Sequence, residues 1–231
     1  FRRSRGLGDV YKRQEPGSFI YVNGSVLNGT NGVLDVDGTI SSQAELYVTE
    51  DITNDAALIV NGHVRLLGNW FNNLGFDSNL GTVFFEGGNQ LISGTSESHF
   101  FNITLDGSGL KTQEINAFSE GILDLKHLEL QTETYSFNVE NEDLNSIIRT
   151  SGFVSSLNGG FLSRKTNQVD HYLFPVGSSQ GVLRYRPVEI KPLDISSNTF
   201  TARLANLDAT LEGYDRLSLI HISEPTRPPE I

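Results

Sequence analysis

The chain has 231 residues, no cysteine and a formal net charge of −11 at neutral pH. The missing cysteines exclude a disulfide framework, a thiol nucleophile and a thiolate metal site. The acidic balance argues against nucleic acid or an anionic membrane as a partner, and no apolar run reaches the roughly 18 residues that would predict a membrane span.

The two terminal stretches differ from the rest of the chain. Residues 1–14 are basic and residues 217–231 are rich in proline, and neither stretch has a strand pattern. Both resemble translated sequencing-adapter peptides, which implies that they are non-native; a basic arm and a Pro-rich linker are the alternatives. We therefore expect residues 15–216 to be the native part, a fragment of a longer protein.

A short motif recurs between residues 20 and 64. It reads apolar residue, any residue, valine, any residue, usually glycine, any residue, then Ile or Val, and its copies begin at Ile20, Leu34, Leu46 and Leu58. Steps of 14, 12 and 12 residues indicate one structural unit stacked on copies of itself. Apolar residues two apart face the same side of a strand, and the glycine marks a bend. The motif predicts a parallel β-helix-like solenoid, with either one step or two steps per coil.

The alternation within each copy separates inward from outward side chains. The central valines are expected to stack as one core column: Val22, Val36, Val48 and Val60. Three outward residues are expected to fall near one line and form a candidate ligand-facing surface: Tyr21, Tyr47 and Ile59. A line of exposed aromatic side chains suits an extracellular glycan or a surface protein as partner, although an ordinary side-chain ladder gives the same pattern.

A different strand-and-turn pattern follows between residues 66 and 105. It contains Gly68-Asn69-Trp70, Gly81-Thr82-Val83-Phe84-Phe85, Gln90-Leu91-Ile92-Ser93-Gly94 and Phe100-Phe101-Asn102-Ile103-Thr104-Leu105. This order resembles a segment of large secreted surface proteins of the Bacteroidota, those exported by type IX secretion or carrying gliding-motility-associated C-terminal regions. The resemblance implies an extracellular or cell-surface location and an adhesin-like or structural role. No catalytic residue belongs to the pattern, and Trp70 within it is expected in the core.

The strand pattern continues to residue 140. Leu123, Leu125, Leu128 and Leu130 share one face of the chain only if it bends at Lys126-His127, as at a solenoid corner. A helix over residues 122–130 is the competing interpretation, because a period of 3.6 residues also gathers part of this set. We expect strands, and we assign residues 15–145 to the β-solenoid.

In residues 146–216 the spacing of the expected strands changes, with longer loops between them. Runs around Phe153, Phe161, Tyr172, Val188 and Phe200 are expected to be antiparallel strands of a β-sandwich-like module. The module is expected to be incomplete and to cover the last rung of the solenoid, since an open core layer must be closed.

The candidate chemical groups form no recognised constellation. Asp35 and Asp37 flank Val36 and would face outward together, as acids or Ca²⁺ ligands do, but no acidic column continues on neighbouring rungs. The five histidines lack the spacing of a zinc site. Arg164, Arg184 and Arg186 are expected either to bind a carboxylate or to pair with acids of the chain, such as Glu189 or Asp170.

The sequence therefore predicts an all-β protein that is not an enzyme and needs no cofactor or metal. Its expected role, implied mainly by the resemblance, is that of a stiff structural or adhesive scaffold in a secreted or cell-surface bacterial protein. A carbohydrate-binding module and a polysaccharide-active β-helix enzyme are the alternatives.

Overall fold

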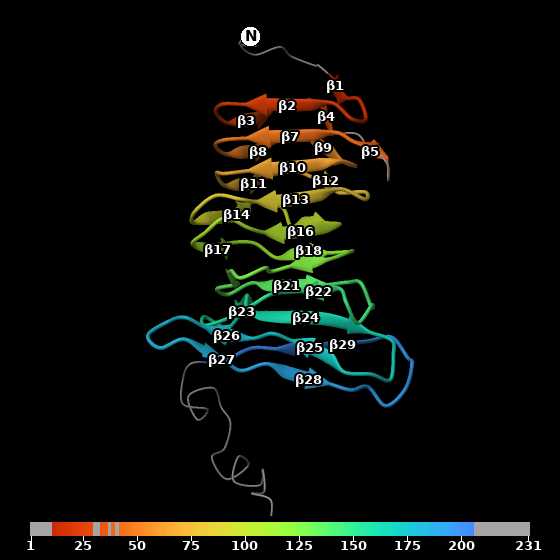
Figure 1. Cartoon of the computed structure of the whole chain (residues 1–231), viewed down its shortest axis with the longest axis vertical. Helices are drawn as coiled ribbons and strands as arrows, with labels where there is room; N and C mark the ends of the chain where they lie inside the picture. The colour runs from red at the N-terminus through yellow and green to blue at the C-terminus, as the bar shows by residue number, and fades with distance from the viewer. Residues whose placement is uncertain (1–10, 30–32, 37, 40–41, 206–231) are drawn as a thin grey trace, which may run out of the picture.

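The chain forms a rod of stacked coils, with the N-terminal coils at one end and the C-terminal strands at the other (Figure 1). The computed structural model describes residues 11–29, 33–36, 38–39 and 42–205. Within these ranges the regular elements are all strands, and they build a β-solenoid of about six turns. The expected all-β fold with a parallel β-helix-like solenoid is therefore confirmed.

Two seven-stranded parallel sheets run the length of the rod. Strands of the first sheet follow one another in this order: β2 (Phe19–Val22), β7 (Glu45–Val48), β10 (His63–Leu66), β13 (Thr82–Phe85), β16 (Asn102–Leu105), β19 (Leu123–Asp124) and β22 (Ile147–Ile148). Strands of the second sheet follow in the same sense: β3 (Val26–Asn28), β8 (Ile52–Asn54), β11 (Trp70–Asn72), β14 (Gln90–Gly94), β17 (Leu110–Gln113), β20 (Glu129–Gln131) and β23 (Phe153–Ser155). Each coil thus contributes one strand to each sheet.

The third side of the rod consists of two shorter sheets. The upper one contains β1 (Tyr11–Gln14), β4 (Val33–Val36), β9 (Ala57–Val60) and β12 (Phe76–Asp77). The lower one contains β15 (Ser98–Phe100), β18 (Ala117–Ser119), β21 (Ser136–Val139), β24 (Phe161–Thr166) and the antiparallel β29 (Asn198–Ala202). A small antiparallel pair, β5 (Gly38–Thr39) and β6 (Ser42–Gln43), lies between β4 and β7 in the chain. Because β1 pairs with β4, strand pairing begins before residue 15, where the solenoid was expected to start.

Two copies of the sequence motif make one coil in the first part of the rod. Ile20 pairs with Leu46, and Val22 with Val48, because both pairs lie on the first sheet. Val36 pairs instead with Val60 on the third side. The single valine column expected from the sequence is therefore wrong: the valines form two columns, which line the same apolar core. The motif glycine lies at the corner between two sides, where Gly24 has φ +138°.

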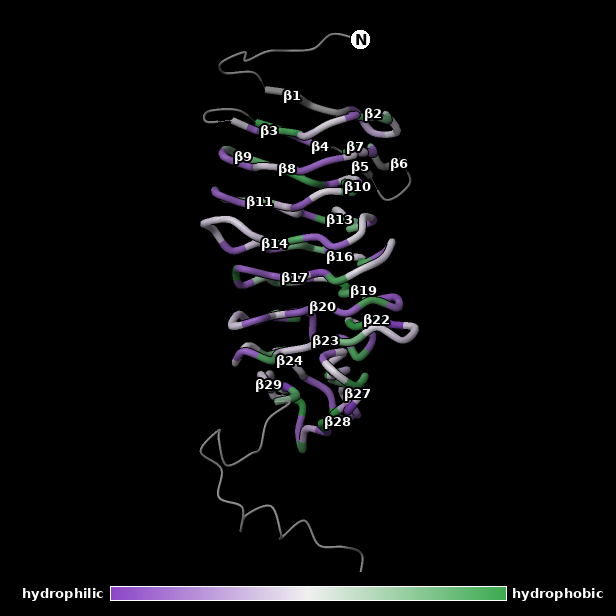
Figure 2. The backbone as a smooth tube through the Cα atoms, turned by 90° about the vertical axis from the view of Figure 1, so that its left-hand side faces the viewer, coloured by the Kyte–Doolittle hydropathy of each residue, from purple (hydrophilic) through white to green (hydrophobic). Residues whose placement is uncertain are grey.

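The core extends without interruption from coil to coil. Figure 2 shows hydrophobic stretches recurring along the rod. On the first sheet, Leu46, Val64, Val83, Ile103 and Leu123 lie in register and are all buried. Burying one such side chain contributes about 1.5–3 kcal/mol. A coil cannot bury this apolar surface alone, so its stability depends on the coil beneath it.

The Gly68-Asn69-Trp70 run shows why small and amide residues recur at the corners. A Cβ atom on Gly68 would overlap the backbone of the preceding coil. The side-chain oxygen of Asn69 accepts the backbone N–H of Leu91, one coil further on, at 2.8 Å. Trp70 is fully buried and donates its indole N–H to Ser98 Oγ at 3.0 Å. The expected core position of Trp70 is thus confirmed.

A ladder of buried asparagines joins the first three coils at the end of the second sheet. The side-chain nitrogen of Asn28 donates to the side-chain oxygen of Asn54 at 2.9 Å, and Asn54 donates in the same way to Asn72 at 2.9 Å. The next in-register position is Gly94, where the ladder ends. Buried amides are tolerated because each side-chain nitrogen also donates to a backbone carbonyl oxygen of the next coil, that of Ala57, Gly75 or Glu97.

The segment 122–130 consists of strands and not of a helix. β19 and β20 are separated by a turn at Lys126 and His127, and Lys126 has φ +45°. This bend places all four leucines of the segment in the core: Leu123, Leu125, Leu128 and Leu130. The predicted corner is confirmed at the predicted residues.

The parallel stack continues beyond residue 145, where the solenoid was expected to end. β22, β23 and β24 pair in parallel with β19, β20 and β21, so the expected antiparallel arrangement is wrong around Phe153. The strand at Phe161, β24, has this parallel neighbour on one side and the expected antiparallel neighbour, β29, on the other. Antiparallel pairing starts at β24, which pairs with β29. Two further antiparallel pairs follow: β25 (Tyr172–Phe174) with β28 (Val188–Ile190), and β26 (Gly177–Ser178) with β27 (Arg184–Tyr185). A β-sandwich in this part of the chain stays a prediction. Tyr172 and Phe174 are buried in the solenoid core, so these strands do cover its last rung.

Substitutions at two adjacent positions of β7 test the inward and outward assignment. Val48→Asp places a carboxylate in the core without a partner, and we expect it to unfold the N-terminal coils. Tyr47→Ala removes only an outer ring contact, worth about 0.5–1.5 kcal/mol. Circular dichroism melting and protease resistance give the ranking. A Tyr47→Ala protein less stable than Val48→Asp would contradict the assignment.

Candidate functional surface

The candidate surface lies on the outer face of the first sheet. Tyr21 pairs with Tyr47, Tyr47 with Arg65, and Arg65 with Phe84, so these four residues form one in-register outward column. We call this column the aromatic stripe. Tyr21, at its N-terminal end, is 49% exposed, and the other three are half-buried. The structure thus brings together two of the three residues predicted for a ligand-facing line.

The side chains of the aromatic stripe contact one another. The rings of Tyr21 and Tyr47 stack with centroids 5.6 Å apart and planes 14° apart, which uses one face of each ring. The guanidinium of Arg65 lies 4.0 Å from the centroid of the Phe84 ring. Arg65 also forms ion pairs with Glu45, at 3.4 Å, and with Glu86. One face of each tyrosine ring and the charge of Arg65, which could otherwise recognise a sugar or an acidic ligand, are therefore engaged within the protein.

Ile59 does not belong to the aromatic stripe. It lies on β9, on the third side of the rod, and its in-register neighbours are Asp35 and Asp77. The expected line of Tyr21, Tyr47 and Ile59 is wrong at this residue, because two motif copies make one coil and successive copies lie on different sides.

Only one member of the predicted acidic pair, Asp35, lies within the described residues. Asp35 is 8% exposed and lies in register between Arg13 and Ile59, while Asp37 lies outside the described residues. Among the described residues no group of three or more His, Asp or Glu side chains is arranged to hold a metal ion.

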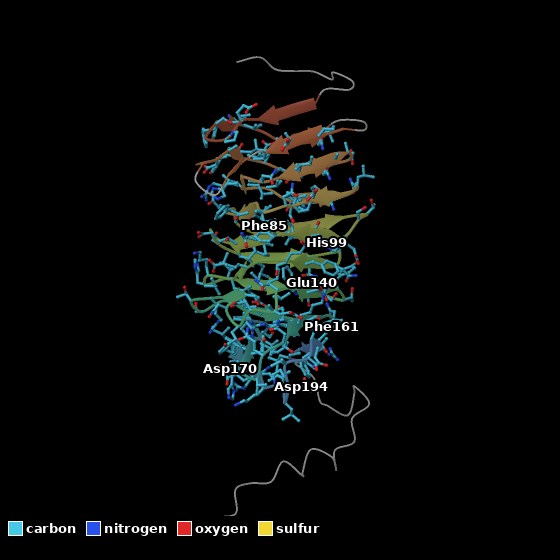
Figure 3. The ribbon with its side chains drawn as sticks, turned by 90° about the vertical axis from the view of Figure 1, so that its right-hand side faces the viewer. Phe85, His99, Glu140, Phe161, Asp170 and Asp194 are labelled. Atoms are coloured by element: carbon cyan, nitrogen blue, oxygen red, sulfur yellow. The ribbon has the colours of Figure 1, made fainter. Side chains whose placement is uncertain are left out.

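The four histidines within the described residues lie on different elements, far apart along the chain. His99, on β15 of the third side, stacks on Phe118 with centroids 4.1 Å apart, and its ring nitrogens lie 3.8 and 4.0 Å from Glu97 and Glu120. Figure 3 labels His99 and Phe161 on the same side of the rod. For His63, burial is the main cause that lowers the pKa, with the charge of Arg65 next. His127 and His171 are exposed, and His221 lies outside the described residues.

Arg164 is a buried structural residue, and its predicted pairing with an acid side chain is not seen. Its guanidinium donates to the carbonyl oxygens of Asp143, Leu144 and Leu173 at 2.7–2.9 Å and to Ser146 Oγ at 3.1 Å. Burial lowers the pKa of Arg164 to about 10. The guanidinium, which could otherwise bind a ligand carboxylate, instead joins the loop before β22 to β25.

The other two arginines of the predicted cluster lie nearer the surface. Arg184 is half-buried on β27, and Arg186 is exposed and donates to the carbonyl oxygen of Tyr185 at 3.0 Å. The buried guanidinium of Arg164 therefore adds nothing to a surface site at these two positions.

Sequence reasoning missed a second buried cation, Lys111 on β17. Its side chain is fully buried, and its ammonium donates to the carbonyl oxygens of Gly87, Gly88 and Ser108 at 2.7–3.0 Å and to Gln90 Oε1 at 2.7 Å. Strand parity was the available signal, since positions 111 and 115 share a face and Ile115 is apolar. Lys111 therefore joins two successive corners from inside the rod.

Comparisons with protein-family models, with curated proteins and with solved structures give no match. The described residues contain no helix that is long and apolar enough to cross a membrane. The geometry of the chain's own residues is therefore the basis for a functional proposal.

The role of Lys111 is tested by Lys111→Met, which preserves the length of the side chain and removes its donors. Four oxygen acceptors lose a shared partner, and we expect the free energy of unfolding to fall by at least about 2 kcal/mol at pH 7.5. Urea unfolding followed by circular dichroism measures the difference. Equal stability of the two proteins would show that the four hydrogen bonds of the Lys111 ammonium are dispensable.

The stability difference between wild type and Lys111→Met is expected to depend on pH. Burial lowers the pKa of Lys111 to about 8 in the folded protein, against 10.5 for an unperturbed lysine. Between these two values the unfolded chain binds more protons than the folded protein, so the lysine's contribution to stability rises with pH. The stability difference between wild type and Lys111→Met should grow from pH 8 to pH 10.5. A difference that is constant over this window would contradict the lowered pKa.

Proposed function

We propose that this chain is a stiff, non-enzymatic scaffold segment of a secreted or cell-surface bacterial protein, with a structural or adhesive role. The observation that carries the proposal is the continuous stack of coils whose interior, corners and outer face are each joined by side-chain ladders. A surface that satisfies its own rings and charges is suited to rigidity. The resemblance to Bacteroidota surface proteins supports the location.

Rigidity follows from how the coils are joined. Each coil is hydrogen-bonded to the next along the two long sheets, and the third side adds further pairs. At about 4.8 Å per coil, six turns extend over roughly 30 Å. Sliding one coil relative to another would break in-register backbone bonds on more than one side at once. A segment of this kind holds whatever lies at its two ends at a fixed separation.

A carbohydrate-binding module is the second candidate, favoured by the exposed ring of Tyr21 next to Tyr47. Its partner would be an extracellular glycan, bound along the aromatic stripe. A polysaccharide-active enzyme has less support, because the predicted acids Asp35 and Asp37 are not accompanied by a further acidic column. The net negative charge also disfavours nucleic acid as a partner.

The scaffold proposal is tested by the distance between the two ends of the rod. The chain has no cysteine, so Ser25→Cys and Asp170→Cys can carry spin labels at exposed positions of the first coil and of the C-terminal region. We expect one narrow distribution of the distance between the two labels in pulsed electron–electron double resonance, because the stacked coils move as one body. A broad or two-component distribution would contradict a rigid spacer.

The same protein is then incubated with a panel of neutral and acidic polysaccharides. A scaffold gives neither saturable binding nor shortened chains. Saturable binding that Tyr21→Ala and Tyr47→Ala abolish, with the fold unchanged by circular dichroism, would favour the carbohydrate-binding module. New reducing ends or unsaturated sugar products would favour the enzyme.

A further inference from the structure

The N-terminal coil has an open hydrogen-bonding edge on two sides. Within the described residues, β2 pairs in the ladder with β7 alone and β3 with β8 alone. The carbonyl oxygens of Ser18 and Val22 accept hydrogen bonds from β7 at 2.9 and 3.0 Å. Backbone groups alternate in direction along a strand, so the N–H and C=O groups of Phe19 and Tyr21 face away from β7. They form a row of donors and acceptors at the end of the first sheet.

The second sheet ends in the same way. The N–H of Val26 and the C=O of Asn28 bond to the β8 side, each at 2.8 Å. By the same alternation, the backbone groups of Leu27 face the open edge. The two edges belong to one coil and together form a surface, which we call the N-terminal rung: β2 and β3.

The core is also uncovered at this rung. Ile20 is 44% exposed, although it is the inward residue of β2. The in-register residues beneath it are at most 8% exposed: Leu46, Val64, Val83, Ile103, Leu123 and Ile147. The column is therefore continuous and dry except at its first member, where a side chain of a further coil would lie.

The rung lacks the features that protect natural strand edges. Residues 16–34 contain no charged residue. Edge strands that stay unpaired usually carry lysine, proline or an inward charge that blocks a neighbouring strand. An uncharged edge beside an exposed core residue is instead the surface that strand addition requires.

At the opposite end of the rod, antiparallel strands cover the core. β29 pairs antiparallel with β24, which reverses the chain direction and ends the parallel stack. Phe174 and Val176 are buried in the core at that end, and Lys165 pairs with Glu140 at its surface. The core is therefore covered at the C-terminal end, whereas its first member, Ile20, is exposed at the N-terminal rung.

The third side shows what kind of strand the rung accepts. β1 already stacks on β4 in parallel, in the register Tyr11 with Val33 to Gln14 with Val36. This is the same relation that joins every coil to the next. We propose that the N-terminal rung binds one further parallel β-coil, an extended segment whose alternate apolar side chains cover Ile20, Val22 and Val26.

The proposal is tested by tethering a copy of residues 45–54 to the N-terminus of the full chain through a flexible Gly/Ser linker. This segment contains β7 and β8, and it would offer to β2 and β3 the edge that it offers to β10 and β11 of the next coil. The linker gives an effective concentration in the millimolar range, which offsets the weak affinity of a single strand. The matched control carries Leu46→Asp and Val48→Asp in the tethered copy only.

Amide hydrogen exchange provides the readout. In the untethered protein the amides of Phe19, Tyr21 and Leu27 should exchange rapidly, and the tethered copy should slow them by about tenfold or more. The control copy should leave them unchanged, as should Ile20→Asp in the rung itself. Fast exchange of these amides with the intact tethered copy would overturn the proposal.

A second test uses the untethered protein. Protection of Phe19, Tyr21 and Leu27 that rises with protein concentration, together with a dimer in sedimentation, would replace the proposed coil by a second copy of the chain. A monomer with unprotected amides supports the proposal.

Discussion

The in-register backbone hydrogen bonding between successive coils is the constraint on which the rest of the structure depends. It places each residue directly over one residue of the coil before it, so side chains of similar chemistry stack in columns parallel to the axis of the rod. Inward lines become the apolar core, corner lines become amide ladders such as Asn28, Asn54 and Asn72, and one outward line becomes the aromatic stripe. The same constraint leaves Ile20 of the first coil exposed, because an in-register column continues until another element covers it. At the C-terminal end the chain reverses direction, and its antiparallel strands cover the core.

The corners also explain why two cations are buried in so acidic a chain. Carbonyl oxygens at a corner turn away from the sheet ladders and need donors from elsewhere. Lys111 supplies them to two successive corners, and Arg164 supplies them to the loop before β22 and to β25. Both side chains donate to backbone oxygens, so they serve the fold and not a ligand. For an all-β rod with a narrow interior, a long side chain with several donors satisfies several corner oxygens at once.

The sequence predicts side-chain orientation and turns well, and it predicts less well which segments stack on one another. Inward valines, a core Trp70 and the corner at Lys126 follow from period-two alternation and turn chemistry, which act within a few residues. Which copy stacks on which depends on coil length, and that length changes from 26 residues between Ile20 and Leu46 to 18 between Leu46 and Val64. Periodicity alone leaves one or two steps per coil open, so it cannot determine that Ile59 lies on a different side from Tyr21 and Tyr47. Lys111 was missed because a lysine is normally assigned to solvent, although its strand parity points inward.

Through-hydrogen-bond NMR couplings test the stacking register most directly, because they identify the donor and acceptor of each bond. The account predicts a coupling from the amide of Thr49 to the carbonyl of Val22, and from the amide of Asn61 to the carbonyl of Val36. Both bonds join motif copies that are two steps apart. A coupling from Thr49 to Val36, one step apart, would mean that each copy forms its own coil, and it would contradict the arrangement described for the N-terminal half of the rod.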